Sequence, residues 1–421
     1  MMFNVVDLFS GAGGMSLGFH RHPEFQLVAA ADIELGKPSA GKGKLQCNTT
    51  FLKNIGLAPA PLDLSTVPPR ELRRELGLAA DLHIHVLSVC PPCTGFSRQN
   101  PLNHVRDDRR NSLVQRAAEF AAALAPDIVV MENARELLRG NFKHHYDSFC
   151  DCLSAHGYRV SGANHMLTKF GLPQIRERAI VVAARAGYEL RVPGDLWRGM
   201  RVRETATHVR QALASITPDA PQHDLYPGFS SELVRRRLHA IPHDGGSWMS
   251  LARHADGDEL MTAAMKRIVS RNRIGSYPDV YGRMAWDRPA PTIKRECAHI
   301  GNGRYAHPEE DRLCSVREMA KLQGFPDDFV FGDTAVSNMY RHIGDAVPPL
   351  ISFQLAHLCH WMLTGEKSHP RRIVLPGTSL RTEDIVQHEQ EEFEYASLPR
   401  RSVSRRRAQT SGVPCRAANA V

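Results

Sequence analysis

Cys93 stands in a setting that could make it a nucleophile. It ends the string Cys-Pro-Pro-Cys at residues 90–93, which follows an apolar run at residues 84–89 that predicts a buried strand. Proline fixes φ and lacks an N–H, so Pro91 and Pro92 end the strand pairing and hold the backbone stiffly extended before the thiol. A polar loop rich in arginine and asparagine follows, from Ser97 to Arg110. A fixed thiol beside a cationic loop indicates chemistry on an anionic polymer.

The spacing of Cys90 and Cys93 allows two other interpretations, because a Cys-x-x-Cys pair can be a redox-active dithiol or half of a zinc site. The remaining cysteines supply no second Cys-x-x-Cys and no matching histidine pair, so we expect no metal. A thioredoxin-like dithiol should precede a helix near the start of a small domain. Here the pair follows a later strand and precedes a loop rich in proline and arginine, but the dithiol stays an alternative.

Polar residues also follow two later strands. Glu132 and Asn133 come directly after the apolar run at residues 128–131, at the edge where open sheets bind ligands. Desolvation beside an apolar sheet raises the pKa of a carboxyl group, which lets it hold a proton. Arg176 and Arg178 occupy alternate positions entering a strand, so we expect them to point the same way. Taken alone, Glu132 could cap a helix and the arginines could form surface ion pairs. Their occurrence in this order at consecutive strand ends favours a single functional site.

A glycine turn follows the first expected strand. Residues 7–15 read Asp-Leu-Phe-Ser-Gly-Ala-Gly-Gly-Met, and a helix should begin there. Backbone N–H groups at such a turn and helix start favour a carboxylate or phosphate, but the spacing is not the dinucleotide fingerprint, which disfavours NAD and FAD. Asp32, at the end of the second strand, could bind ribose hydroxyls. The two features suit a small nucleoside with a carboxylate tail; the alternative is a plain tight turn beside a solvated aspartate.

Composition sets the class of protein. With 421 residues, 42% of them hydrophobic, the chain can bury a large core, and we expect two domains. Lysine and arginine number 53 against 45 acidic residues, giving a formal net charge of +8, which favours acidic partners. Nine cysteines without framework spacing indicate a reducing compartment, and no apolar run approaches a membrane span. We therefore expect a soluble, cytoplasmic protein.

Short apolar runs alternate with helical patterns over the first 185 residues, which predicts an open, mostly parallel α/β sheet covered by helices. The expected strands are residues 4–8, 27–31, 84–89, 128–131, 158–163 and 179–184, with helices over 113–124 (Ser112 as N-cap), 315–322 and 347–363. We expect a first domain over residues 1–187 and a second, irregular one with a return segment over 188–343. A helix over 344–365 should complete the first domain, and residues 366–421 should form a disordered basic tail.

Taken together, these strings resemble the DNA (cytosine-5) methyltransferase family. The match is collinear from Asp7 to about Leu355, the middle domain excepted, and includes Asp108 to Leu113, Arg288 to Ile293, Arg317-Glu318 and Leu322 to Pro326. The resemblance implies the Rossmann-like fold of S-adenosylmethionine-dependent methyltransferases with an added DNA-recognition domain.

The resemblance also implies roles for single residues. Cys93 would add to C6 of cytosine, Glu132 would hydrogen-bond N3, and Asn133 would position the nucleophile's loop. Arg178 and Arg176 would stabilise negative charge. Phe9 would lie under the adenine of S-adenosylmethionine, Asp32 would bind its ribose, Ile33 would pack on the adenine and Asp63 would read its amino group. The full cofactor set is Phe9, Ser10, Gly11, Gly13, Gly14, Asp32, Ile33, Asp63, Leu64, Pro92 and Asp345.

The expected substrate is double-stranded DNA, with the target base flipped out and the loop over residues 94–108 closing on it. Basic residues of the middle domain should contact phosphates and guanines: Arg198, Arg201, Arg203, Arg210, Arg235, Arg236, Arg237, Lys266, Arg267, Arg271 and Arg273. The resemblance to this family further implies a bacterial, nucleoid-associated monomer that works beside a cognate restriction endonuclease. The alternatives are a tRNA cytosine-5 methyltransferase and a non-enzymatic DNA-binding protein.

Three positions depart from the family pattern. Asp345 stands where the last motif has asparagine, and an ionised carboxylate cannot donate the hydrogen bonds that an amide donates. Ala134 replaces the usual valine, and Cys90 occupies a position often filled by glycine. None of the three removes a catalytic group.

Overall fold

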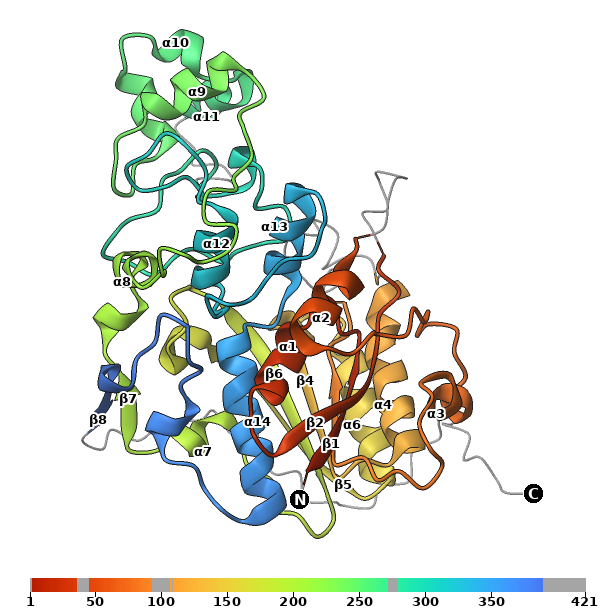
Figure 1. The fold of residues 1–421 in the computed structure, drawn as a ribbon. Helices are drawn as coiled ribbons and strands as arrows, with labels where there is room; N and C mark the ends of the chain where they lie inside the picture. Colours follow the sequence, from red (N-terminus) through yellow and green to blue (C-terminus); the bar gives the residue numbers. More distant parts are fainter. Residues whose placement is uncertain (1, 36–44, 93–106, 108, 272–278, 389–421) are drawn as a thin grey trace.

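A six-stranded sheet organises the larger part of the chain (Figure 1). The structure is a computed structural model that describes residues 2–35, 45–92, 107, 109–271 and 279–388. The strands are β1 (Phe3–Leu8), β2 (Phe25–Ala31), β3 (Val86–Val89), β4 (Ile128–Ala134), β5 (Tyr158–Met166) and β6 (Glu177–Arg185). They lie in the order β2-β1-β3-β4-β6-β5; β2, β1, β3 and β4 pair in parallel, and β6 is antiparallel to both of its neighbours. This confirms the predicted open, mostly parallel α/β sheet and all six expected strands.

Helices cover both faces of the sheet, so the central strands β1, β3 and β4 are buried along their whole length. On one face Phe120 and Phe149 pack against Val6 and Leu87, and the helices are α3 (Leu72–Glu75), α4 (Leu113–Leu124) and α6 (His144–Ala155). The other face carries α1 (Gly14–His20) and α14 (Pro349–Thr364). The short helices α2 (Cys47–Ile55) and α5 (Glu136–Arg139) complete this part. The predicted helix over 113–124 is confirmed, but the Ser112 side chain makes no cap hydrogen bond.

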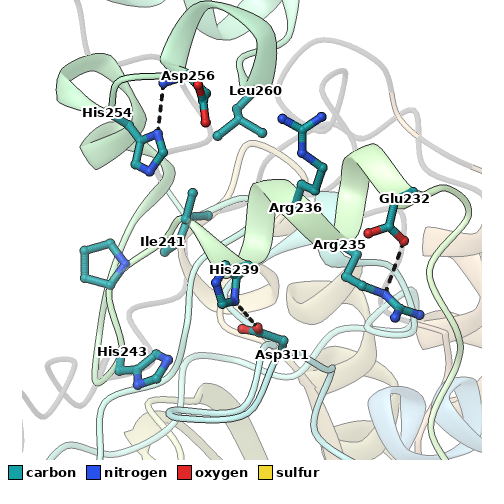
Figure 2. Close-up of a pocket in the computed structure, with 12 residues that line it drawn as sticks. Glu232, Arg235, Arg236, His239, Ile241, His243, His254, Asp256, Leu260 and Asp311 are labelled. Carbon is teal, nitrogen blue, oxygen red and sulfur yellow. Dashed lines mark hydrogen bonds and ion pairs between the residues drawn. The ribbon is translucent and has the colours of Figure 1, made fainter.

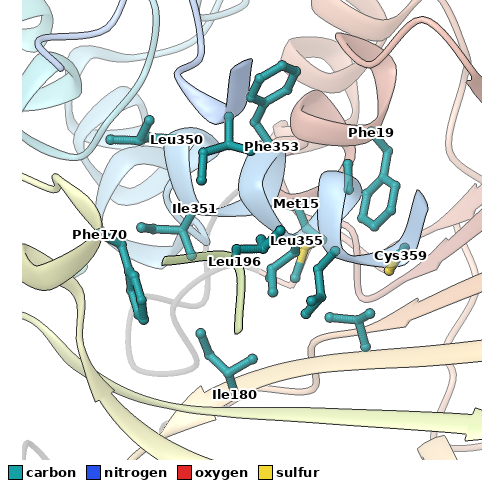
Figure 3. Packing of buried hydrophobic residues seen from close by; sticks show 14 of the residues in the cluster. Met15, Phe19, Phe170, Ile180, Leu196, Leu350, Ile351, Phe353, Leu355 and Cys359 are labelled. Atoms are coloured by element: carbon teal, nitrogen blue, oxygen red, sulfur yellow. The ribbon is translucent and has the colours of Figure 1, made fainter. Parts of the chain in front are cut away.

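Helix α14 comes late in the chain but lies against the first helix, as Figure 3 shows for Leu350, Phe353 and Leu355. The contact is close because Gly18 has no side chain: a Cβ there would lie 2.2 Å from the Phe353 nitrogen. The segment after the middle domain therefore returns to complete the sheet's helical layer, and it brings residues 344–349 to the glycine turn.

Three buried histidines, His22, His357 and His360, lie between α1 and α14, with the rings of His22 and His357 4.5 Å apart. Burial lowers the pKa of His22 to about 4 and that of His357 to about 3. An unfolded histidine titrates near pH 6.5, so below that pH the unfolded chain binds more protons than the native one.

Acid should therefore destabilise the fold through this cluster. We expect the free energy of unfolding to fall by about 1 kcal/mol per pH unit for each of His22 and His357 as the pH drops from about 6.5 to about 4. Urea titrations across this range would measure the slope. The variant His357→Phe should lose about half of the cluster's share of the slope, and an unchanged slope would contradict this assignment.

The second lobe lies beyond the carboxyl ends of the parallel strands, on the side of the sheet away from the N-terminus (Figure 1). Its elements are short: α8 (Val209–Ala214), α9 (Glu232–His239), α10 (Gly257–Leu260), α11 (Ala263–Ser270), α12 (Val316–Leu322) and α13 (Val336–Asp345). The preceding α7 (Pro193–Trp197) and β7 (Met200–Val202) pack instead in the core of the first domain, with α7 beside α14 (Figure 1). One core around Tyr305 and Phe325 joins the lobe to the sheet, and a smaller one around Trp248 lies among α9, α10 and α11. None of the helices in the described ranges has the length and apolar character needed to cross a membrane.

The prediction of a disordered tail over residues 366–421 is wrong for residues 370–388. Residues 370–388 contain two single 3₁₀ turns (Pro370–Ile373 and Thr382–Asp384) and the strand β8 (Ile385–Gln387), which pairs antiparallel with β7. Ile373, Leu375 and Leu380 are buried in the core of the first domain, which gives this polar segment enough apolar contact to be ordered. Residues 389–421 lie outside the described part of the chain.

Candidate active site

Glu132 and Arg178 meet at the carboxyl edge of the sheet. Because β6 runs antiparallel to β4, its first residues lie where β4 ends, and Ala134 pairs with Arg178. Arg178 Nε lies 2.9 Å from Glu132 Oε1, and the two side chains keep only 15% and 10% of their surface exposed. A buried carboxylate beside a guanidinium can hold a polar ring by hydrogen bonds while water is excluded.

Asn133 connects this edge to the nucleophile's segment. Its Nδ2 donates to the Pro91 carbonyl over 3.0 Å, and its Oδ1 accepts from the Ala134 N–H. Asn133 therefore contacts the backbone two residues before Cys93, which is consistent with its expected role in positioning this loop. Cys93 itself and residues 94–106 lie outside the described residues, and the exposed Pro92 is the last described residue before them.

The environment of Cys90 disfavours the thiolate form. Burial raises the pKa of the Cys90 thiol well above its usual range, and the nearby charges of Asp7 and Glu132 raise it further. Since the thiolate is the reactive form, Cys90 should stay protonated and inert. This environment does not suit the redox-active dithiol considered from the sequence.

Arg176 and Gln174 hold the return segment. Arg176 donates to the carbonyls of Ile293 (3.0 Å) and Ala346 (3.4 Å), whereas Arg178 contacts Glu132. Gln174 donates to Gln323 and accepts from the Ile293 N–H. Arg176 and Gln174 therefore connect the sheet edge to the segments that follow the middle domain.

The glycine turn has left-handed backbone at three residues, one of which is not a glycine. Phe9, Gly11 and Gly13 have positive φ values of 62°, 51° and 92°. A Cβ on Gly14 would lie 2.4 Å from the Val347 carbonyl oxygen, so this position admits no side chain while α14 stays in place. Ser10 is buried, and its hydroxyl lacks a hydrogen-bond partner within the described part of the chain.

Asp32 lies beside this turn. Its Oδ2 accepts from the Gly11 N–H over 2.9 Å and its Oδ1 from the Glu34 N–H over 2.7 Å. Ile33 keeps 41% of its surface exposed. The Asp32 N–H donates to the Ala60 carbonyl, so the segment that follows Ala60 runs close to the end of β2. In this segment Leu64 is buried, whereas Asp63 is exposed and accepts hydrogen bonds from Ser65 in its own turn.

Acidic groups gather around the glycine turn. Burial raises the pKa of Asp7 to about 6, and Ser16 donates to its carboxylate over 2.6 Å. Surrounding protein atoms likewise raise the pKa of Asp345 to about 6, although its side chain keeps 35% of its surface exposed. The charge of Asp32 contributes to raising both pKa values, so the three carboxyl groups lie close enough to influence one another. The sequence analysis assigned no role to Asp7, although it begins the glycine string. It also assigned none to Arg295, which pairs with Asp345 and which no local sequence pattern marks.

The basic residues predicted for DNA contact divide into several groups. Arg237 is buried and donates to the Leu260 carbonyl, which is a structural role. Arg210 and Arg236 form exposed ion pairs with Asp287 and Glu259. Arg235 and Arg236 line a cavity of about 560 Å³ with His239, His243 and His254 (Figure 2). Arg273 lies outside the described residues.

The fold is that of the S-adenosylmethionine-dependent methyltransferases. A DNA modification methyltransferase encoded within an E. coli prophage superposes with a TM-score of 0.58 at 20% identity, covering 86% of this chain and 99% of that one. The Dnmt2 methyltransferase of S. pombe gives a TM-score of 0.55 at 16% identity, with the same coverage.

The chain belongs to the C-5 cytosine-specific DNA methylase family, whose sequence model matches residues 3–361. It is 31% identical over 395 residues to the Type II methylase M.HgiDII of Herpetosiphon aurantiacus, covering 89% of this chain and all of that one. It is therefore a DNA (cytosine-5) methyltransferase, as the sequence predicted. The tRNA alternative is not favoured, because relatives that match most of the chain are Type II methyltransferases.

Proposed function

We propose that this chain is the modification enzyme of a restriction-modification system, which transfers a methyl group from S-adenosylmethionine to C5 of a cytosine within a specific duplex sequence. The observation that carries the proposal is the buried pair of Glu132 and Arg178, 2.9 Å apart at the sheet edge that leads to Cys93. Its Type II relatives support the modification role.

In the proposed reaction Cys93 activates the ring. Cytosine C5 is too weakly nucleophilic to be methylated unaided, so the Cys93 thiolate forms a bond to C6 while Glu132, carrying or sharing a proton, hydrogen-bonds N3. The ring then has enamine character at C5. After methylation, loss of the C5 proton re-forms the C5–C6 double bond and expels the Cys93 thiolate. Arg178 stabilises the negative charge on this side of the ring, and Arg176 acts by holding the return segment against the edge.

In this proposal the glycine turn, Asp32 and Asp345 border the cofactor crevice. S-adenosylmethionine, when bound, supplies an electrophilic methyl group on a positively charged sulfonium. The Asp32 carboxylate beside the Gly11 N–H can accept hydrogen bonds from the ribose hydroxyls of this ligand. The exposed Ile33 offers an apolar face for the adenine, and the buried Ser10 hydroxyl, which has no hydrogen-bond partner among the described residues, can bond a ligand. Phe9, Gly11, Gly13 and Gly14 shape the turn around it.

DNA enters between the two lobes in this proposal. The target atom is hidden in a duplex, so the base is flipped out toward Glu132, and the loop over 94–108 closes on the DNA. Arginines of the second lobe then bind phosphates and base edges. We also propose that the enzyme acts as a monomer in the bacterial cytoplasm, at the nucleoid, beside a cognate restriction endonuclease.

One experiment tests the reaction and its substrate. Purified enzyme is given S-adenosylmethionine labelled in its methyl group together with duplex DNA or tRNA, and incorporation is counted. We expect label in DNA alone. Bisulfite sequencing of DNA from cells expressing the enzyme should then show 5-methylcytosine at one fixed position of one sequence. Label in tRNA, or in neither nucleic acid, would overturn the proposal.

A further inference from the structure

Arg295 joins two walls of the proposed cofactor crevice. Its Nη1 lies 2.8 Å from Asp345 Oδ2, and its Nη2 donates to the Leu35 carbonyl over 3.3 Å. Leu35 follows Asp32 and Ile33 on one wall, and Asp345 ends α13 on the other. The Arg295 side chain keeps 25% of its surface exposed and that of Asp345 35%, so their ion pair is partly shielded from solvent, whereas the contact with Leu35 is exposed.

Asp345 needs a cationic partner. A carboxylate at the last residue of α13 meets the negative end of the helix dipole. Asp32 and Glu296 add negative charge nearby, and the surrounding protein removes water from the carboxylate. Arg176 is the other cation that acts on Asp345, but its guanidinium is engaged by the carbonyls of Ile293 and Ala346. Arg295 is thus the group in direct contact that neutralises Asp345.

The backbone brings Arg295 to this position. A Cβ on Gly344 would lie 2.3 Å from the Lys294 carbonyl oxygen, so the chain at residues 294–295 packs directly against the end of α13. The family motif has a neutral asparagine where this chain has Asp345, and a neutral residue would need no such partner. The aspartate and the arginine therefore form one unit.

We propose that Arg295 is a positioning residue for the methyl donor: it compensates the aspartate at position 345 and fastens the Leu35 wall to the end of α13, so that the crevice keeps the shape that binds S-adenosylmethionine. The inference rests on the proposed function, because it assigns this crevice to that cofactor. Arg295 acts through the crevice walls rather than on the reacting atoms.

Calorimetric titration with S-adenosylmethionine, and separately with S-adenosylhomocysteine, tests the inference on the full-length enzyme. Arg295→Gln should raise the Kd of both ligands by about tenfold, because an uncompensated carboxylate remains and the walls separate. Adding Asp345→Asn to Arg295→Gln should recover most of the lost affinity, because the uncompensated carboxylate is then removed. With saturating cofactor, kcat should change little while KM for the cofactor follows Kd.

Arg21→Gln is the matched control, since Arg21 forms a similar ion pair with Asp328 at 2.7 Å outside the crevice; its Kd should be unchanged. If Arg295→Gln does not fold, as judged by thermal unfolding, Arg295→Lys carries the test, because lysine keeps the charge but cannot bridge both partners. Wild-type affinity in Arg295→Gln, or no recovery in the double variant, would overturn the inference alone. A wild type that binds neither ligand would remove the proposed function and the inference with it.

Discussion

Replacing Cys93 with alanine is expected to reduce kcat for DNA methylation by about 10⁴-fold or more, because alanine cannot form the covalent bond to C6. Binding of S-adenosylmethionine should be retained, since the side chain is small and the cofactor contacts come from other residues. Single-turnover methyl transfer, measured with excess enzyme, would quantify the loss without interference from product release.

Cys90→Ala is the matched control for this prediction. The Cys90 thiol is held protonated by burial, so its removal should leave kcat within about threefold of the wild type. If instead both variants lost activity together, a dithiol mechanism would replace the single-nucleophile one. Normal methylation by Cys93→Ala would exclude Cys93 as the nucleophile.

Glu132→Gln is expected to lower kcat by about 10²- to 10⁴-fold, because the amide can hydrogen-bond N3 but cannot carry or share the proton that the ring requires. The substitution keeps the size of the side chain next to Arg178, so the fold and the affinity for the cofactor should be preserved. Rapid-quench measurement of methyl transfer at saturating DNA would separate a loss in the chemical step from a loss in binding.

Glu136→Gln serves as the control for Glu132→Gln, since Glu136 lies on the next helix and pairs with Arg135 at 3.0 Å. Its kcat should match the wild type. Arg178→Gln combined with Glu132→Gln should lose little more than the worse single variant, because the two residues act as a unit. Full activity of Glu132→Gln would be incompatible with the proposed role of this carboxyl group.

The sheet could be predicted from sequence because its central strands are buried on both faces. Such strands are short and largely apolar, and β1, β3 and β4 all have this form apart from a few buried polar residues. The carboxyl edge followed directly, since polar residues after parallel strands must share one side of a sheet. The N-cap role of Ser112 failed for a local reason: a 3₁₀ turn over Arg109–Ser112 runs into α4, so Ser112 has helical backbone angles.

Other features depend on contacts between distant segments, which no local pattern encodes. Arg237 and Arg176 look like surface charges in the sequence, yet both are buried and bonded to backbone carbonyls. The pair of Arg295 and Asp345 joins residues 50 positions apart in the sequence. The segment over 370–388 was misjudged because its few apolar residues follow no period, although each fills a place in an existing core.

The pairing of β7 with β8 has a consequence for exchanging specificity between related enzymes. Arg201 lies opposite Val386, so the chain enters the second lobe through a strand that pairs with β8. A graft that begins before Met200 would leave β8 without its native partner and Ile385 without its packing. Chimeric enzymes should therefore keep β7 with the parent that supplies residues 370–388, and take foreign sequence only after Val202.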